Sequence, residues 1–162
     1  PNLSSILVFN VDKKMLKQNW ISSTYTDLNL SIDSPDALYR SPDSTINKLT
    51  FISSNKNLEI NLITKPIDEN SDLSNELIND FKERNFINVI TKNEDFQTLD
   101  GDKGVKIFGS FDDQNLNRKK DYSTILFVVN KLSIKLEIIF ERGNANLQKI
   151  VDRVINSLKF NK

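Results

Sequence analysis

The sequence predicts an α+β domain, in which helices flank a mostly antiparallel β-sheet. Residues 58–62 alternate apolar and polar side chains, and so does most of the segment 132–141, which is the period of a half-buried strand. Residues 73–84 and 147–158 repeat apolar side chains every three to four positions, which is the period of an amphipathic helix. Short connections between most of the expected strands favour antiparallel pairing, because parallel strands need long crossovers.

The mid-chain helix carries signals at both of its ends. Asp72 or Ser71 suits its N-cap, because a side-chain oxygen there accepts a free backbone N–H. Lys82 and Arg84 suit the negative end of the helix dipole. Asn85 follows as a residue that tolerates the left-handed conformation in which many helices end.

The second half of the chain is otherwise predicted as a meander of strands. Its extended segments are expected over residues 86–90, 96–99, 105–111, 122–130 and 132–141. A glycine turn over 101–104 and a long polar loop over 112–121 separate some of them. The apolar run 125–129 indicates a central strand buried on both faces. Gly143 then separates the last strand from the closing helix.

The first 50 residues are predicted as short strands around an irregular segment. The expected strands cover residues 4–11, 21–26, 28–33 and 46–53, with a short helix over 12–19. The two middle strands are expected to pair antiparallel. Pro35 and Pro42 enclose the irregular segment.

Composition excludes several classes of function. The 162 residues fit one domain. The sequence holds no Cys and no His, which excludes Cys nucleophiles, His general bases, Cys/His zinc sites and disulfides. Its 22 basic and 22 acidic residues give a net charge of zero, which argues against a dedicated nucleic-acid binder. No apolar run is long enough to span a bilayer as a helix.

Three charged motifs are better explained by structure than by ligand binding. The acidic run 68–72 offers oxygen ligands for Ca²⁺, but it lacks the EF-hand spacing and suits a helix N-terminus. The run 100–104 lacks the following helix that a phosphate loop needs, so we expect a β-turn. The basic run 118–120 is expected in a solvated loop, with contact to an acidic partner or anionic headgroups as the alternative.

No catalytic motif is recognisable. The pairs Glu94/Asp95 and Asp112/Asp113 are adjacent on expected strands, so their side chains point to opposite faces. No Ser-x-x-Lys stands at a helix start. We therefore expect no enzyme, and neither a cofactor nor a metal site.

The aromatic side chains of the first third are the candidate binding residues. Trp20, Tyr25 and Tyr39 lie outside clear core periodicity. Tyr and Trp are enriched at binding surfaces because they offer a large contact area with few rotatable bonds. We predict that these three residues contact a partner. The alternative is that Trp20 and Tyr25 close one end of the sheet.

Several segments, in this order, carry a resemblance to a known family. They are the strand pair 20–32 that leads to Pro35, the helix 73–84, the glycine turn 101–104 and the closing motif Ser157-Leu158-Lys159-Phe160. This order resembles the PsbP-like superfamily, which includes DcrB-type bacterial envelope lipoproteins and the eukaryotic Ran-release factor. The resemblance covers residues 20–162 as a single domain. Residues 1–19 are then an N-terminal segment, either a tether or an added strand or helix.

The resemblance implies an α/β/α sandwich and a function in binding. It implies a non-catalytic binding or assembly module of the bacterial cell envelope that recognises a protein partner. We expect a monomer, and the zero net charge predicts no nucleic-acid partner. The alternatives are a carrier of a small apolar ligand held between sheet and helix, a hydrolase of unrecognised type, and a cytoplasmic adaptor. The resemblance assigns no functional residue.

The start of the sequence bears on its expected location. It begins with Pro1 instead of Met, from which we expect that an export signal, a lipidated segment or a trimmed stretch preceded it. This predicts the periplasm or cell envelope, with a possible lipid anchor upstream. A lipobox cysteine in a longer precursor would support that location over the cytoplasm.

Overall fold

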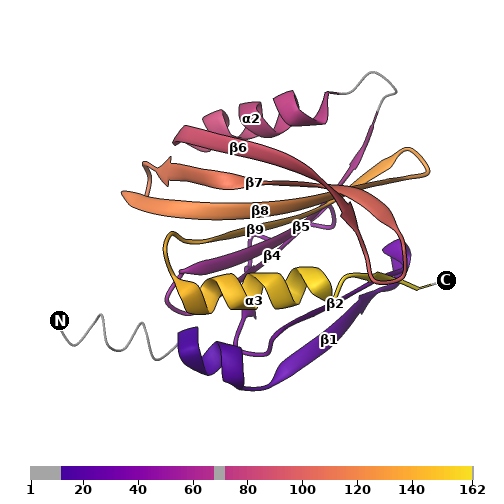
Figure 1. Cartoon of the computed structure of the whole chain (residues 1–162), viewed down its shortest axis with the longest axis horizontal. Coiled ribbons are helices and arrows are strands. Elements are labelled where there is room, and N and C mark those ends of the chain that lie inside the picture. The colour runs from indigo at the N-terminus through magenta and orange to yellow at the C-terminus, as the bar shows by residue number, and fades with distance from the viewer. Residues whose placement is uncertain (1–11, 68–71, 162) are drawn as a thin grey trace.

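A large antiparallel sheet separates two helices in the structure, which is a computed structural model that describes residues 12–67 and 72–161. Helix α2 (Leu73–Glu83) lies on one side of the sheet and helix α3 (Ala145–Asn156) on the other (Figure 1). A second, smaller sheet lies on the α3 side. The expected α+β sandwich is therefore confirmed, with the difference that two sheets form it.

All strand pairs in both sheets are antiparallel, as the sequence predicts. The seven-stranded sheet has, in spatial order, β3 (Tyr39–Arg40), β4 (Lys48–Ile52), β5 (Leu58–Pro66), β9 (Leu132–Glu141), β8 (Arg118–Val129), β7 (Lys103–Asp113) and β6 (Phe86–Gln97). The three-stranded sheet has the order β1 (Trp20–Tyr25), β2 (Leu30–Pro35) and β10 (Lys159–Phe160). A 3-10 turn (Thr26–Leu28) joins β1 to β2, and residues 12–17 are helical.

The main core lies between α3, the small sheet and one face of the large sheet. Helix α3 buries the apolar stripe that its sequence predicts, namely Leu147, Ile150, Val151, Val154 and Ile155. Each fully buried side chain of this size contributes about 1.5–3 kcal/mol to stability. The sheet supplies the alternating apolar residues of β5 and β9. The apolar stripe of the predicted helix thus packs against the apolar face of the predicted strands.

A second, aromatic core lies under α2. The ring of Phe81 has its centroid 4.9 Å from that of Tyr122, 5.2 Å from Phe111 and 5.5 Å from Phe86. Edge-to-face and tilted pairs at such distances are favourable beyond their buried area. Only Leu77 and Phe81 of α2 are buried, so this helix is attached over a narrow part of the sheet.

The predicted ends of α2 are confirmed. The Oδ1 atom of Asp72 accepts the backbone N–H groups of Ser74 and Asn75, at 3.2 Å each. Asn85 is left-handed, with φ of 59°. Asn144 caps α3 by accepting the N–H of Leu147 at 3.1 Å. Short polar side chains therefore set both helix starts, because they satisfy N–H groups that have no partner within the helix.

The prediction of two separate extended segments over 86–90 and 96–99 is wrong. Strand β6 continues through the polar residues between them, and among the described strands it pairs only with β7. It is an edge strand and is mostly exposed, so polar residues can occupy both of its faces without cost. A bulge between Ile87 and Ile90 interrupts its register, and Asn88 has φ of 52° there.

The long loop predicted over 112–121 is also wrong. Strand β7 extends to Asp113 and β8 starts at Arg118, so only a short turn joins them. Lys120 is 3 % exposed, and its ammonium donates to the carbonyl of Lys56 at 3.3 Å. Burial lowers the pKa of Lys120, and the nearby Arg118 lowers it further. The basic run 118–120 is therefore part of a strand with a buried lysine and not a solvated loop.

The first described residues pack on the main core. Met15 is 3 % exposed and belongs to that core. Asp12 is fully buried, and its carboxylate accepts the side-chain amides of Asn55 at 2.9 Å and Asn144 at 2.8 Å. The short helix expected here is confirmed over residues 12–17. The strand expected over 4–11 lies outside the described residues.

Gly109 is required by the close approach of β7 to the bulge of β6. A Cβ atom at Gly109 would lie 1.8 Å from the carbonyl oxygen of Ile90. The hydroxyl of Tyr122 donates to that same carbonyl at 3.1 Å, so the backbone at Ile90 is held in place. We expect Gly109→Ala to lower the free energy of unfolding by about 2 kcal/mol or more, because a rigid backbone must move.

Urea denaturation measures this loss, with Gly143→Ala as the matched control. Gly143 has φ of 76° but open space around it, so only the strain of a left-handed alanine applies, about 1 kcal/mol. Equal losses in the two variants would contradict the steric argument.

The buried Lys120 predicts a pH dependence of stability. Its pKa in the folded protein is lowered, so the unfolded chain binds more protons between that value and the ordinary lysine pKa of about 10.4. Stability then rises with pH across this window. We expect Lys120→Met to lose this rise, whereas Lys119→Met, at an exposed neighbour, retains it. Urea denaturation from neutral pH to about pH 10 tests this, and identical profiles for both variants would contradict it.

Candidate functional site

Strand register arranges polar side chains in rows on the face of β4, β5 and β9 that looks toward α2. Lys48 pairs with Ile63, and Ile63 pairs with Lys135, so these three residues form one row across three strands. Neighbouring strands lie about 4.8 Å apart, which separates the Cα atoms of Lys48 and Lys135 by roughly 10 Å. The next row along the strands is formed by Thr50, Asn61 and Glu137.

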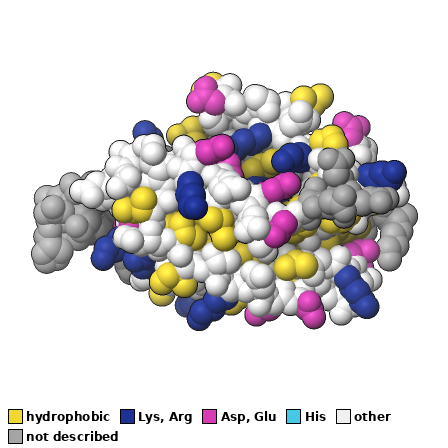
Figure 2. Space-filling model, turned by 90° about the horizontal axis from the view of Figure 1, so that it is seen from above, with side chains coloured by type: hydrophobic (Ala, Val, Ile, Leu, Met, Phe, Trp, Pro, Cys, Tyr) yellow, Lys and Arg dark blue, Asp and Glu magenta, His cyan; other side chains and the backbone are white. Residues whose placement is uncertain are grey.

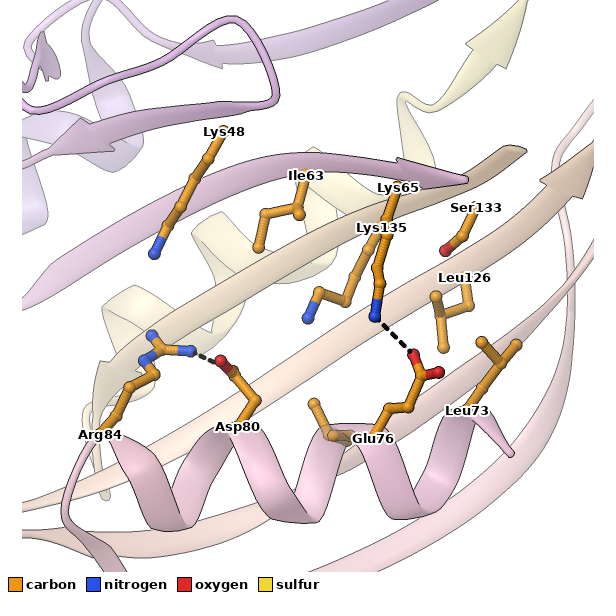
Figure 3. A pocket seen from close by; sticks show the side chains of 11 residues that line it. Lys48, Ile63, Lys65, Leu73, Glu76, Asp80, Arg84, Leu126, Ser133 and Lys135 are labelled. Carbon is orange, nitrogen blue, oxygen red and sulfur yellow. Dashed lines mark hydrogen bonds and ion pairs between the residues drawn. The ribbon is translucent and has the colours of Figure 1, made fainter. Parts of the chain in front are cut away.

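A groove of about 230 Å³ lies between these rows and α2. We call it the charged groove. Its lining residues are Lys48, Ile63, Lys65, Leu73, Glu76, Leu77, Asp80, Arg84, Leu126, Ser133 and Lys135. Figure 3 shows the lysines reaching from the strands toward the helix, which presents its acidic side chains to them. Basic, acidic and hydrophobic side chains are interspersed on this side of the molecule (Figure 2).

A buried ion pair fixes the end of the groove at the C-terminus of α2. Glu137 is fully buried, and Nη1 of Arg84 donates to its two oxygens at 3.0 and 3.2 Å. The same nitrogen donates to Asp80 at 2.9 Å. Asn61 donates to Glu137 at 3.0 Å and accepts the hydroxyl of Thr50 at 2.7 Å. The network therefore joins α2 to three strands.

The carboxylates around Arg84 affect its pKa more strongly than its burial does. Burial lowers the pKa of Arg84, but Glu137 and Asp80 raise it by more, so the net shift is upward. The guanidinium is therefore charged at any physiological pH. It also lies 4.8 Å from the ring centroid of Phe86, where a cation is attracted by the ring face.

The lysines of the charged groove are less fully paired. Lys65 lies 3.4 Å from Glu76 in an exposed pair, and Lys135 lies 3.9 Å from Glu137, which Arg84 already neutralises. Within residues 12–67 and 72–161, the ammonium of Lys48 has neither an ion pair nor a hydrogen bond. The groove thus keeps positive charge that no carboxylate of the described chain balances.

The three aromatic residues predicted as binding residues do not lie together. Trp20 and Tyr25 occupy the two ends of β1, five residues or roughly 17 Å apart. Tyr39 is 44 % exposed on the short edge strand β3 of the other sheet. The indole of Trp20 donates to the carbonyl of Met15 at 3.2 Å, and the guanidinium of Arg153 lies 3.9 Å from its ring centroid. Their contact with a partner stays a prediction.

Tyr25 lines a second groove, where the small sheet meets β4 and β5. This groove has a volume of about 400 Å³ and is also lined by Leu28, Leu49 and Leu62, with Ile46 92 % exposed at its edge. Burial raises the pKa of Tyr25, against an opposing effect of Arg40. The groove lies at the junction of the sheets, whereas the space between α3 and the large sheet is filled by fully buried side chains.

The carboxylate pairs weighed for catalysis have separate partners. Glu94 lies 3.5 Å from Lys106, and Asp112 lies 3.3 Å from Arg142. Among the described residues, no group of three or more acidic side chains is placed to hold a metal ion. None of the described helices has the length and hydrophobicity that crossing a bilayer requires.

Sequence reasoning missed the residues of the charged groove. The alternation of 132–141 places Lys135 and Glu137 on the polar face of their strand, and this is confirmed. The alternation of side chains along a strand does not show which of them a helix will cover. In the structure, α2 covers Glu137 and does not cover Lys48. The available signal was the row of charged side chains along the strand predicted over 132–141.

No protein-family model and no curated protein sequence matches this chain. Solved structures do match it. One is the Ran-binding protein Mog1p of Saccharomyces cerevisiae, with a TM-score of 0.58 and 10% identity over 88% of this chain and 95% of Mog1p. Another is the cyanobacterial PsbP of Synechocystis sp. PCC 6803, with a TM-score of 0.55 and 11% identity over 87% of this chain and 92% of that protein. A variant of Mog1 matches with a TM-score of 0.56 and 10% identity, over 90% of this chain and 97% of its own.

This chain has the Mog1/PsbP fold. The PsbP-like fold expected from the order of elements is thereby confirmed. Identities near one in ten show the fold alone, because a fold of this kind can carry different sites.

The buried pair predicts that neutralising Glu137 destabilises the protein far more than neutralising Glu76. Glu137→Gln leaves the guanidinium of Arg84 with Asp80 as its only charged partner, and we expect a loss of about 3 kcal/mol in the free energy of unfolding. Glu76→Gln removes only the exposed pair with Lys65 and is expected to cost less than about 1 kcal/mol. Urea denaturation of both variants measures this. A loss at Glu137 as small as that at Glu76 would contradict the assigned role of the pair.

Proposed function

We propose that this protein is a non-catalytic protein-binding module that recognises its partner at the charged groove. The observation that carries this proposal is an open groove in which Lys48 has no partner among the described residues, beside a side-chain network that is fully paired. Mog1p, which shares the fold, is described as a Ran-binding protein. That description gives support for binding as the general function and none for Ran as the partner.

The groove is suited to surface recognition because its walls are held before a partner arrives. Arg84 is fixed by Glu137 and Asp80, and Asn61 and Thr50 continue this network into β5 and β4. A preorganised surface loses less conformational entropy on binding than one that must first order its side chains. Lys65 and Glu76 at the open side are exposed and remain adaptable.

The untested predictions from the sequence are kept as part of this proposal. A bacterial envelope location and a DcrB-type lipoprotein would place the partner in the envelope. Trp20, Tyr25 and Tyr39 are alternative contact residues, with Tyr25 in the second groove as the best placed of them. Neither an enzymatic activity nor a bound cofactor is part of the proposal.

Site-specific photo-crosslinking tests the proposal. A photoreactive amino acid replaces Lys65 at the charged groove, Ile46 at the second groove, or Lys149 on the exposed side of α3. We expect a discrete crosslinked protein from position 65 in extracts of the source organism, and none from position 149. A product from position 46 alone would move the binding site to the groove of Tyr25 and overturn the assignment. Equal products from all three positions would also overturn it.

A further inference from the structure

The charge of the groove is distributed unevenly between its two walls. The strands contribute Lys48, Lys65 and Lys135, whereas α2 contributes Glu76 and Asp80 together with Arg84. Arg84 forms ion pairs with the buried Glu137 and with Asp80, and Glu76 forms an ion pair with Lys65. The positive charge that remains available to a ligand lies on the strand wall, at Lys48 and Lys135.

Apolar side chains alternate with these cations along the same row. Ile63 lies between Lys48 and Lys135 by strand pairing, and Leu126 follows Lys135 on β8. All four residues line the groove. A ligand that fits this row has carboxylates spaced by roughly 10 Å and apolar groups between them.

We infer that the charged groove binds an acidic segment of a protein partner, whose carboxylates pair with Lys48 and Lys135 while its aliphatic groups lie against Ile63 and Leu126. This inference rests on the proposed function and names the chemistry of the partner. Ion pairs of this kind raise association rates and specificity more than they raise affinity. The binding is therefore expected to weaken as salt increases.

The acidic side chains of α2 favour a protein segment over a polyanion. Glu76 and Asp80 face the lysines across the groove (Figure 3) and would repel a continuous chain of phosphates. A peptide can place single carboxylates at the strand wall and keep the helix wall free of negative charge. The net charge of zero for the whole protein agrees with a local and directional attraction.

Fluorescence anisotropy with a defined peptide tests the inference. The probe is a fluorescein-labelled peptide with Glu at every third position among Ala and Ser, and its control has Gln at the same positions. We expect the Glu peptide to bind the wild-type protein at low salt and the Gln peptide not to bind. Lys48→Glu should weaken binding at least tenfold, because it reverses the one lysine of the charged groove whose ammonium has no partner among the described residues.

Two further variants separate binding at the groove from general charge attraction. Lys149→Glu changes the net charge equally at an exposed position on α3 and should alter binding less than twofold. Lys135→Gln removes the second cation without adding a carboxylate beside Glu137, and should also weaken binding. Equal effects of Lys48→Glu and Lys149→Glu would reduce the binding to general charge attraction and overturn the inference.

The two proposals fail in different ways. A crosslinked partner at position 65 together with no binding of the Glu peptide would overturn the acidic-segment inference and leave the protein-binding function in place. Binding of the Glu peptide that Lys48→Glu weakens supports the inference directly, and crosslinking then shows whether a natural partner uses the same groove.

Discussion

The carboxylate of Glu137 is fully buried in the middle of the central strand β9, and the position of α2 depends on how that charge is neutralised. An unpaired ion at such a site would cost several kcal/mol, so a cation must be brought to it. Arg84 does this from the C-cap position of α2, where its guanidinium reaches Glu137 over the ring of Phe86. The need to neutralise Glu137 thus determines where the C-terminus of α2 lies on the sheet.

The charged groove follows from the same arrangement. Helix α3 buries five side chains and covers its face of the sheet closely, but α2 buries only Leu77 and Phe81. The aromatic core holds α2 over β6, β7 and β8, and no other element of residues 12–67 and 72–161 covers the polar face of β4 and β5. A sheet face that is not covered keeps its charged side chains in contact with solvent, and this is where the lysines of the groove lie.

This chain shares its fold with Mog1p and PsbP although only about one residue in ten is identical. The fold therefore depends on the pattern of residue types more than on particular residues. Alternating apolar residues on β5 and β9, one apolar stripe on each helix and small polar caps are enough to specify the layers. The residues of a surface groove are under no such requirement. Charge and register within this chain are therefore the basis for its proposed function.

The sequence by itself determined the local structure wherever the apolar periodicity and the capping or turn residues indicate the same element. The strand 132–141, both helices, the cap at Asp72 and the turn at Asn85 follow from short-range chemistry, since a cap or an apolar stripe needs only neighbouring residues. The tertiary structure alone decided that polar residues 91–95 continue an edge strand, that Lys120 is buried, and that Lys48 and Lys135 share one row. These outcomes depend on which strands become neighbours. Strand order is a property of long-range packing, and no local pattern encodes it.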